Sequence, residues 1–232
     1  MSGQSPLAVA DRADLRHASR ILAALVLPIG PLAVGVLRYI LPYFSASNPR
    51  ETAADVLASE GQQSAVLWLG LIATFTLLPG VLAVGRLTRR GAPRLTAAAM
   101  LMVVPGYLGL TYLIASDMVL WTGARAGLDA STLAQLAGTV HPTSNIGIGV
   151  FVLGHVIGTV LLGLALLRSR TVPAWAAIVT VVAQPLHFVA LVILGIPALD
   201  FAAWTANGVA FGVASIAILR MSDDEWDLPP AR

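Results

Sequence analysis

The sequence has no cysteine and no lysine, and charged residues of either sign are scarce. The absence of cysteine excludes disulfides, thiolate metal sites and cysteine nucleophiles. All 14 basic residues are arginine, and Asp, Glu, Lys and Arg together make up only 11% of the 232 positions. Charge this low excludes an ordinary water-soluble globular domain, in which about a quarter of the residues are charged.

Familiar catalytic motifs are also missing. The sequence contains no Walker-type phosphate loop, no G-x-S-x-G elbow, no H-E-x-x-H motif and no pair of aspartates inside an apolar segment. The pI near 9.5 could suggest a nucleic-acid partner, but the arginines fall in loops between apolar runs, as in membrane proteins. We therefore expect no nucleic-acid binding and identify no catalytic residue, and of the two open alternatives a protein without enzyme activity is favoured over an enzyme.

Hydrophobic residues dominate what is present, at 57% of the chain with a mean hydropathy of +0.81. They form six apolar segments, each long enough to cross a bilayer: 21–43, 63–84, 95–115, 146–167, 174–195 and 199–219. A cleaved signal peptide is an alternative for the first segment, but that segment is longer than a signal core and is interrupted by Pro28 and Pro31. The sequence predicts an all-α polytopic bundle of six transmembrane helices in a lipid bilayer.

Two connecting segments have helix signals of their own. Asn48-Pro49-Arg50-Glu51 combines an N-cap side chain, proline at the first helical position and glutamate at the third. Asp129 and Gly138 bracket a second short helix in the longest connection. We expect short extracytoplasmic helices after the first and third spans.

The arginines are distributed unevenly between the two ends of the predicted spans. Eleven of them lie in the terminal tails and in the loops after spans two and four, whereas Arg38, Arg50 and Arg125 lie on the opposite side. The positive-inside rule then places both termini in the cytoplasm. This predicts a cytoplasmic tail over 1–20, a transmembrane domain over 21–219 and a cytoplasmic tail over 220–232.

Two histidines lie deep inside neighbouring spans. His155 precedes Arg168 by 13 residues, and His187 follows Pro173 by 14 residues. At about 1.5 Å rise per residue, both lie roughly 20 Å from the basic turn, near the middle of a hydrocarbon core about 30 Å thick. We expect the two imidazoles at the same depth.

Polar residues share the helix faces of these histidines. Thr159 lies one turn from His155, beside a small-residue surface of Gly154 and Gly158, and Thr180 and Gln184 lie on the face of His187. One interpretation is that neutral imidazoles only hydrogen-bond to neighbouring helices. The other is a pocket for a small apolar ligand or a partner membrane protein, because polar groups in hydrocarbon are costly unless they are satisfied. The predicted ligand-binding residues are His155, Thr159, Thr180, Gln184 and His187.

Haem or metal ligation by His155 and His187 is an alternative hypothesis. Directly packed helices leave too little room for a porphyrin between two imidazoles. Two histidines alone are a thin metal site, and the sequence indicates no carboxylate at their depth, which also weakens a proton relay.

A second polar group is predicted toward the outer membrane face. Arg38 closes the first span, Asp117 ends the third and Asp200 opens the sixth, with Asn207 on the face of Asp200. We expect Arg38 to pair with Asp117 or Asp200. The alternatives are ordinary interfacial anchoring and a vestibule above the histidines; the vestibule would be completed by Tyr39, Tyr43, Tyr112, Trp121 and His141.

Three stretches carry a resemblance to known proteins: LPIGPLAVGVLRYILPY, FVLGHVIGTVLLGLALLRSR and VVAQPLHFVALVILG. They resemble the small six-helix membrane proteins of unknown function found in GC-rich bacteria, over about residues 20–220. The resemblance implies a helical bundle in the bacterial inner membrane and transfers no site residue.

The leading hypothesis is ligand or partner binding near the two histidines, with a redox subunit as the first alternative. A small transporter is the second alternative. It rests on proline-broken helices and on a similarity between segments 80 residues apart, in which Pro93 matches Pro173 and Pro105 matches Pro185.

Overall fold

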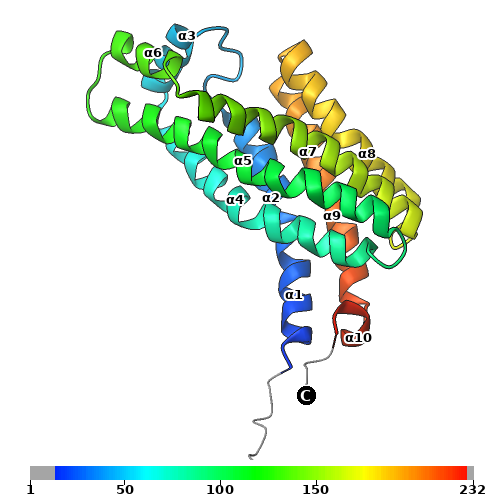
Figure 1. Ribbon diagram of the computed structural model, residues 1–232. Coiled ribbons are helices and arrows are strands. Elements are labelled where there is room, and N and C mark those ends of the chain that lie inside the picture. The colour runs from blue at the N-terminus through cyan, green and yellow to red at the C-terminus, as the bar shows by residue number, and fades with distance from the viewer. Residues whose placement is uncertain (1–13, 229–232) are drawn as a thin grey trace, which may run out of the picture.

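The computed structural model describes residues 14–228, and every regular element in that range is a helix (Figure 1). Six helical segments in this part of the chain are long and apolar enough to cross a membrane. They are Arg16–Ile40, Glu60–Thr88, Pro93–Arg125, Pro142–Ser169, Ala174–Leu194 and Pro197–Leu219. The predicted all-α bundle of six spans is confirmed.

The first span consists of α1 (Arg16–Val26) and α2 (Ile29–Ile40), which meet at Pro28 as the proline pattern predicts. The helix begins at Arg16, whereas the sequence prediction placed a tail up to residue 20. The charged side chains of this extra turn are held by the other end of the chain, because Arg20 pairs with Asp223 at 3.1 Å. The rest of the predicted tail, 1–13, lies outside the described residues.

The middle helices are longer than their apolar cores. These are α4 (Glu60–Thr88), α5 (Pro93–Arg125) and α7 (Pro142–Ser169). α5 has 33 residues and is therefore about 50 Å long, well beyond the thickness of the hydrocarbon core. Its last turns extend beyond the length needed for a span and pack against α3 and α6.

The fifth span changes its helical geometry along its length. α8 (Ala174–Phe188) continues into the π-helical segment η1 (Val189–Leu194). Gly195 then adopts φ +64°, and the N–H of Ile196 donates to the carbonyl of Ala190 at 3.0 Å, so the helix ends in a left-handed cap. Pro197 begins α9 (Pro197–Leu219) immediately afterwards, so α8 and α9 are antiparallel neighbours.

Both predicted short helices are present. α3 (Pro49–Ala58) has Asn48 as its N-cap, and the Asn48 side chain accepts from the N–H groups of Arg50 and Glu51. α6 (Ala130–Gly138) has Asp129 in the same role. The two helices pack on each other at one end of the bundle, where α3 and α6 meet in Figure 1.

α5 and α7 approach each other so closely that their backbones touch. A Cβ atom added to Gly106 would lie 2.6 Å from the backbone of Gly154, and one on Gly158 would lie 2.6 Å from Val103. This is the small-residue contact expected at Gly154 and Gly158. It fixes the position of His155 relative to α5.

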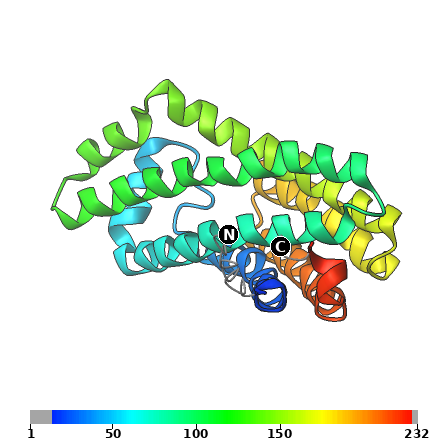
Figure 2. The ribbon, with the colours of Figure 1, turned by 60° about the horizontal axis from the view of Figure 1, so that its bottom comes forward.

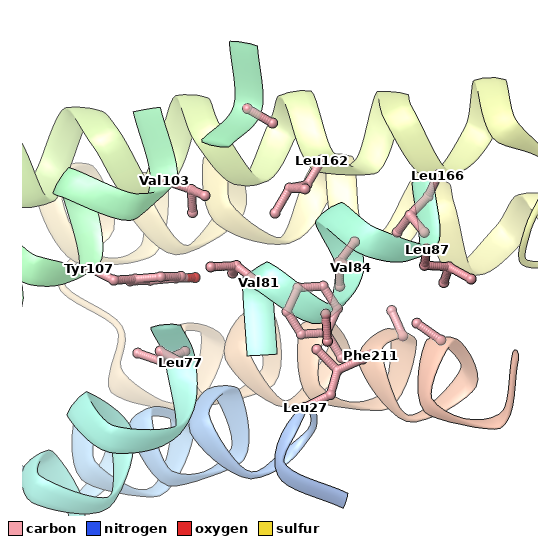
Figure 3. Packing of buried hydrophobic residues seen from close by; sticks show 14 of the residues in the cluster. Leu27, Leu77, Val81, Val84, Leu87, Val103, Tyr107, Leu162, Leu166 and Phe211 are labelled. Carbon is pink, nitrogen blue, oxygen red and sulfur yellow. The ribbon is translucent and has the colours of Figure 1, made fainter. Parts of the chain in front are cut away.

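The apolar core runs through the bundle between these helices. Figure 3 shows Leu77, Val81 and Val84 along one face of α4, with Leu27 and Phe211 below them and Leu162 and Leu166 from α7 above. Large apolar side chains also cover the outside: Leu101 is 77% exposed and Phe75 is 72% exposed. An exterior of this kind suits lipid as its surroundings.

Both ends of the described chain meet at the end of the bundle opposite α3 and α6 (Figures 1 and 2). The predicted C-terminal tail contains a single helical turn, α10 (Asp223–Trp226), closed by a capping box at Ser222. Trp226 is 2% exposed, donates to Ser19 at 3.0 Å and lies under the guanidinium of Arg86. The tail is therefore packed onto α1 and α4.

Candidate functional site

The two buried histidines lie side by side. His155 from α7 and His187 from α8 have ring centroids 5.5 Å apart, and Trp204 from α9 lies 5.9 Å from the first and 5.3 Å from the second. Phe151, one turn before His155, stacks on it at 4.3 Å. Three helices thus bring their aromatic rings together inside the membrane-spanning region.

Each histidine uses its Nδ1 atom in a hydrogen bond. Nδ1 of His155 lies 2.6 Å from the Phe151 carbonyl oxygen, and Nδ1 of His187 lies 2.5 Å from Asp200 Oδ1. A carbonyl and a carboxylate can only accept, so both Nδ1 atoms carry a proton and donate. The ring orientation of both imidazoles is therefore fixed.

Asp200 corrects the expectation that no carboxylate lies at the depth of the histidines. Its side chain is fully buried and accepts from His187, 13 residues away in sequence. The reason is the short turn at Gly195 and Ile196, which returns the chain so directly that the first turn of α9 lies against the last turns of α8. The pattern Gly-Ile-Pro after the apolar run was the available signal.

Arg38 joins the same cluster from α2. Its Nε donates to Asp200 Oδ2 at 2.8 Å, and its guanidinium lies 4.7 Å from the centroid of the Phe44 ring. Of the two partners considered from the sequence, the structure pairs Arg38 with Asp200. We call Arg38, Asp200 and His187 the buried charge chain.

Asp117 has a different partner. The Tyr43 hydroxyl, in the connection that follows α2, donates a hydrogen bond to Asp117 near the end of the membrane-spanning part of α5. Burial, together with the neighbouring Asp117 carboxylate, raises the pKa of Tyr43 well above its usual range, so the hydroxyl keeps its proton.

A cavity of about 270 Å³ lies between α2, α4, α5, α7, α8, η1 and α9, next to this cluster. Its polar wall residues are Arg38, Tyr43, Asp117, His155 and His187. Most of the remaining wall is aliphatic or aromatic. It comprises Val34, Leu37, Leu41, Gly70, Ala73, Leu110, Leu113, Ile114, Ile148, Phe151, Val152, Phe188, Leu191, Val192 and Trp204. The site is thus an apolar chamber with polar groups concentrated on part of its wall.

The cavity has two neighbouring environments. Val192 is 60% exposed, so the wall reaches the lipid-facing surface at η1. A second hollow of about 630 Å³ lies toward α3 and α6 and shares Tyr43, Leu113, Asp117 and Ile148 with the cavity. The hydrogen-bonded pair of Tyr43 and Asp117 stands where the two meet.

Several predicted site residues lie outside the cavity wall. Thr159, Thr180 and Gln184 are buried but do not line it, and the Thr180 hydroxyl donates to the Ala176 carbonyl of its own helix. The cavity opens beyond His187 toward Val192, whereas Gln184 lies one turn the other way. There α7 and α8 close together, since a Cβ on Gly163 would lie 2.7 Å from the backbone of Val181.

Part of the predicted outer polar cluster is also placed differently. Asn207 is buried about two turns deeper than Asp200, where α9 packs tightly on α2, and it does not line the cavity. Tyr112 and His141 line the second hollow as expected for a vestibule. Tyr39 instead packs on Phe201, and the indole of Trp121 donates to the Glu60 carbonyl.

The geometry does not fit a haem between the histidines. Their ring centroids are only 5.5 Å apart on directly packed helices, which leaves no room for a porphyrin between them. Within residues 14–228, no group of three or more His, Cys, Asp or Glu side chains is arranged to hold a metal ion. We therefore derive no redox step from this site.

The fold and the site together define a class: a six-helix bundle with the architecture of an integral membrane protein and a polar cluster inside its spans. Neither the family models, the curated proteins nor the solved structures compared with the chain give a match. The function is therefore inferred from the site alone.

Proposed function

We propose that the protein binds a small, mostly apolar molecule in the cavity beside His155 and His187. The observation that carries this proposal is an apolar chamber of about 270 Å³ with two members of the buried charge chain, Arg38 and His187, in its wall. Chambers lined by apolar side chains with a few convergent polar groups are typical small-molecule sites. The exposed position of Val192 gives a lipid-soluble ligand a lateral route from the bilayer.

A matched pair of variants on α7 tests the proposal. Val152 lines the cavity, whereas Val150 is 41% exposed on the lipid-facing surface of the same helix. Val152→Trp fills the chamber, and Val150→Trp adds the same bulk outside it. The wild type and both variants would be purified from native membranes, and organic extracts would be compared by mass spectrometry.

We expect a lipid-soluble molecule to copurify with the wild type and with Val150→Trp, and to be lost from Val152→Trp. Retention of the same molecule by Val152→Trp would contradict binding in this cavity. An equal melting temperature for the two variants shows that the loss does not come from unfolding.

A small transporter is the second candidate, favoured by the shared wall of the cavity and the outer hollow. In this candidate, the hydrogen bond between Tyr43 and Asp117 separates the two compartments. Proteoliposomes containing the wild type would then move the copurified molecule across the bilayer, and Val152→Trp would not. Binding without flux favours a binding protein.

The proposed location is the bacterial inner membrane with both termini in the cytoplasm. The support is the excess of arginines at the α1 and α10 end of the bundle and the resemblance to small six-helix proteins of GC-rich bacteria.

A further inference from the structure

Three cavity-lining side chains have a buried polar atom with no hydrogen-bond partner within residues 14–228. These atoms are Arg38 Nη2, His155 Nε2 and Trp204 Nε1. His155 and Trp204 are each only 1% exposed. Nine other buried polar atoms of the described residues also have no partner, and none belongs to a residue that lines the cavity. Because buried polar groups are usually hydrogen-bonded, the three atoms on wall residues are the contacts open to a ligand of this cavity.

The three atoms differ in whether they donate or accept a hydrogen bond from a ligand. Arginine and tryptophan nitrogens can only donate hydrogen bonds. His155 already donates from Nδ1 to the Phe151 carbonyl, so Nε2 of the neutral ring can only accept. The matching ligand group must both accept and donate, and a hydroxyl is the smallest group that does so.

The charges around the cavity favour a neutral ligand. Arg38 is already paired with Asp200, and Asp117 adds a second carboxylate to the wall. An anionic head would meet Asp117 without a free cation to offset it. A cationic head could approach Asp117, but that carboxylate already accepts from the Tyr43 hydroxyl, and the head would also lie near the guanidinium of Arg38. A charged head of either sign would therefore meet a group of its own sign in the cavity wall while it is desolvated, and a neutral head would not.

The rings around the cavity favour a flat ligand. Phe151, His155 and Trp204 are nearly parallel, with interplanar angles of 14° and 13° to His155. Phe188 and Tyr43 complete an aromatic wall. Aromatic pairs gain from offset stacking in addition to the burial of their surface, so a planar ring fits this wall better than a branched aliphatic group.

Resting on the proposed ligand site, we propose that its occupant is a neutral, lipid-soluble hydroxyaromatic compound of the phenol or hydroquinone class. Its hydroxyl donates to Nε2 of His155 and accepts from Nε1 of Trp204, whose ring lies beside that of His155. Its ring lies beside the parallel stack of Phe151, His155 and Trp204.

Three probes of nearly equal shape test this inference: 2-naphthol, 2-methoxynaphthalene and naphthalene. Equilibrium dialysis against the full chain in nanodiscs gives each affinity, and nanodiscs with Val152→Trp correct for partition into lipid. We expect 2-naphthol to bind about tenfold or more tightly than 2-methoxynaphthalene, since the ether leaves His155 Nε2 without a donor. Addition of EDTA should leave this preference unchanged; its loss with EDTA would indicate binding through a metal and would overturn the inference.

Two further variants assign the contacts. His155→Phe keeps a ring in the stack but removes the acceptor, so the preference for 2-naphthol over 2-methoxynaphthalene should fall to about onefold, while naphthalene binding is kept. Trp204→Phe removes the donor together with part of the ring, so naphthalene binding serves as the reference, and both oxygen-containing probes should weaken relative to it.

The outcomes separate the inference from the proposed function. Equal affinity of the wild type for 2-naphthol and 2-methoxynaphthalene overturns the hydroxyl contact and leaves the ligand site standing. Failure of all three probes to bind the wild type above Val152→Trp overturns both. If His155→Phe does not fold, Trp204→Phe still tests the proposed hydroxyl geometry. That geometry is contradicted if Trp204→Phe binds the two oxygen-containing probes as well, relative to naphthalene, as the wild type does.

Discussion

Asp200 shows how individual residues hold this membrane-spanning site together. Its carboxylate is fully buried, yet it accepts from Arg38 on one oxygen and from His187 on the other. Burying a charge is costly unless it is paired and hydrogen-bonded, and here both oxygens have a donor. The same contacts connect α2, α8 and α9, so the cluster links three helices.

Removing one partner of this pair should therefore cost more than removing both. We expect Asp200→Asn and Arg38→Gln each to lower stability by about 3 to 5 kcal/mol, because the first leaves Arg38 without its carboxylate and the second leaves the buried Asp200 with only the His187 hydrogen bond. The double variant should be clearly more stable than the sum of the two losses predicts. Thermal unfolding in detergent gives the stability of the wild type, the two single variants and the double variant. If the stability losses of the single variants simply add up in the double variant, the ion pair is contradicted.

The sequence predicted part of this cluster, and the missing part has a physical cause. Arg38 and Asp200 were placed at similar depth near the same face, so their pairing could be anticipated. The contact between Asp200 and His187 was not predicted, because straight α-helical rise on either side of the Gly-Ile-Pro turn leaves their depths roughly 7 Å apart. It depends on the π-helical segment after Phe188 and on the left-handed Gly195, which local sequence patterns do not encode clearly.

At the scale of whole elements, the contact between α5 and α7 is set by glycine. A Cβ on Gly106 would lie 2.6 Å from the backbone of Gly154, which a side-chain rotation cannot relieve. Gly149 lies on the same helix α7, with nothing within 4 Å of an added Cβ.

These two positions form a matched test. Gly106→Ala must push the helices apart and should destabilise the protein by about 1 to 3 kcal/mol, the usual cost of overpacking. Gly149→Ala should leave stability unchanged or slightly raised, since alanine is the better helix former. Melting temperatures in the same detergent compare them; an unchanged Gly106→Ala would contradict the close approach.

The cap of α6 makes a prediction about pH. Asp129 accepts hydrogen bonds from the backbone N–H of Thr132 and from other groups of Ser131 and Thr132, in the first turn of α6. These bonds lower the pKa of Asp129 from its usual 3.8 to about 2. A carboxylate with a lowered pKa stabilises the folded state above its ordinary pKa and loses that contribution as pH falls through the lowered value. The cap should therefore weaken between about pH 4 and pH 2.

Hydrogen exchange of the α6 amides checks this. Asp129→Ala should exchange faster than the wild type at neutral pH, and Asp129→Asn should resemble the wild type because its oxygen still accepts. At each pH, the exchange rate of the α6 amides in Asp129→Ala is divided by the rate in the wild type. This ratio should approach one as the pH falls toward 2. A ratio that stays constant would contradict the assigned cap.

Helices could be predicted from the sequence more completely than the tertiary contacts between them. The caps at Asn48 and Asp129 identified both short helices, because a capping side chain acts on its own next turn. The lengths of the spans were underestimated, since hydropathy marks only the part in lipid. α5 continues to Arg125 because its last turns pack on α6 through Leu120 and Ala124 against Leu133, a tertiary contact that no local pattern shows.

For the molecule as a whole, the two ends of the bundle differ in kind. At one end α1 and α10 meet through Arg20 and Asp223, close to the arginine-rich turns. At the other end α3 and α6 cover the hollow that borders the cavity. If the arginine-rich end faces the cytoplasm, the hollow opens to the exterior and the cavity can be reached from outside or from lipid.

The absence of cysteine makes this orientation simple to test. Single cysteines can replace Leu228, which is 78% exposed beside α10, and Gln135, which is exposed on α6. In intact bacterial spheroplasts, a membrane-impermeant maleimide should label Gln135→Cys at once and Leu228→Cys only after lysis, with the cysteine-free wild type as the blank. Labelling of Leu228→Cys before lysis and of Gln135→Cys only after lysis would show that the proposed orientation is wrong and that both termini lie outside, because six spans keep both termini on one face. Labelling of both before lysis would contradict a bundle that separates α6 from α10 across a membrane.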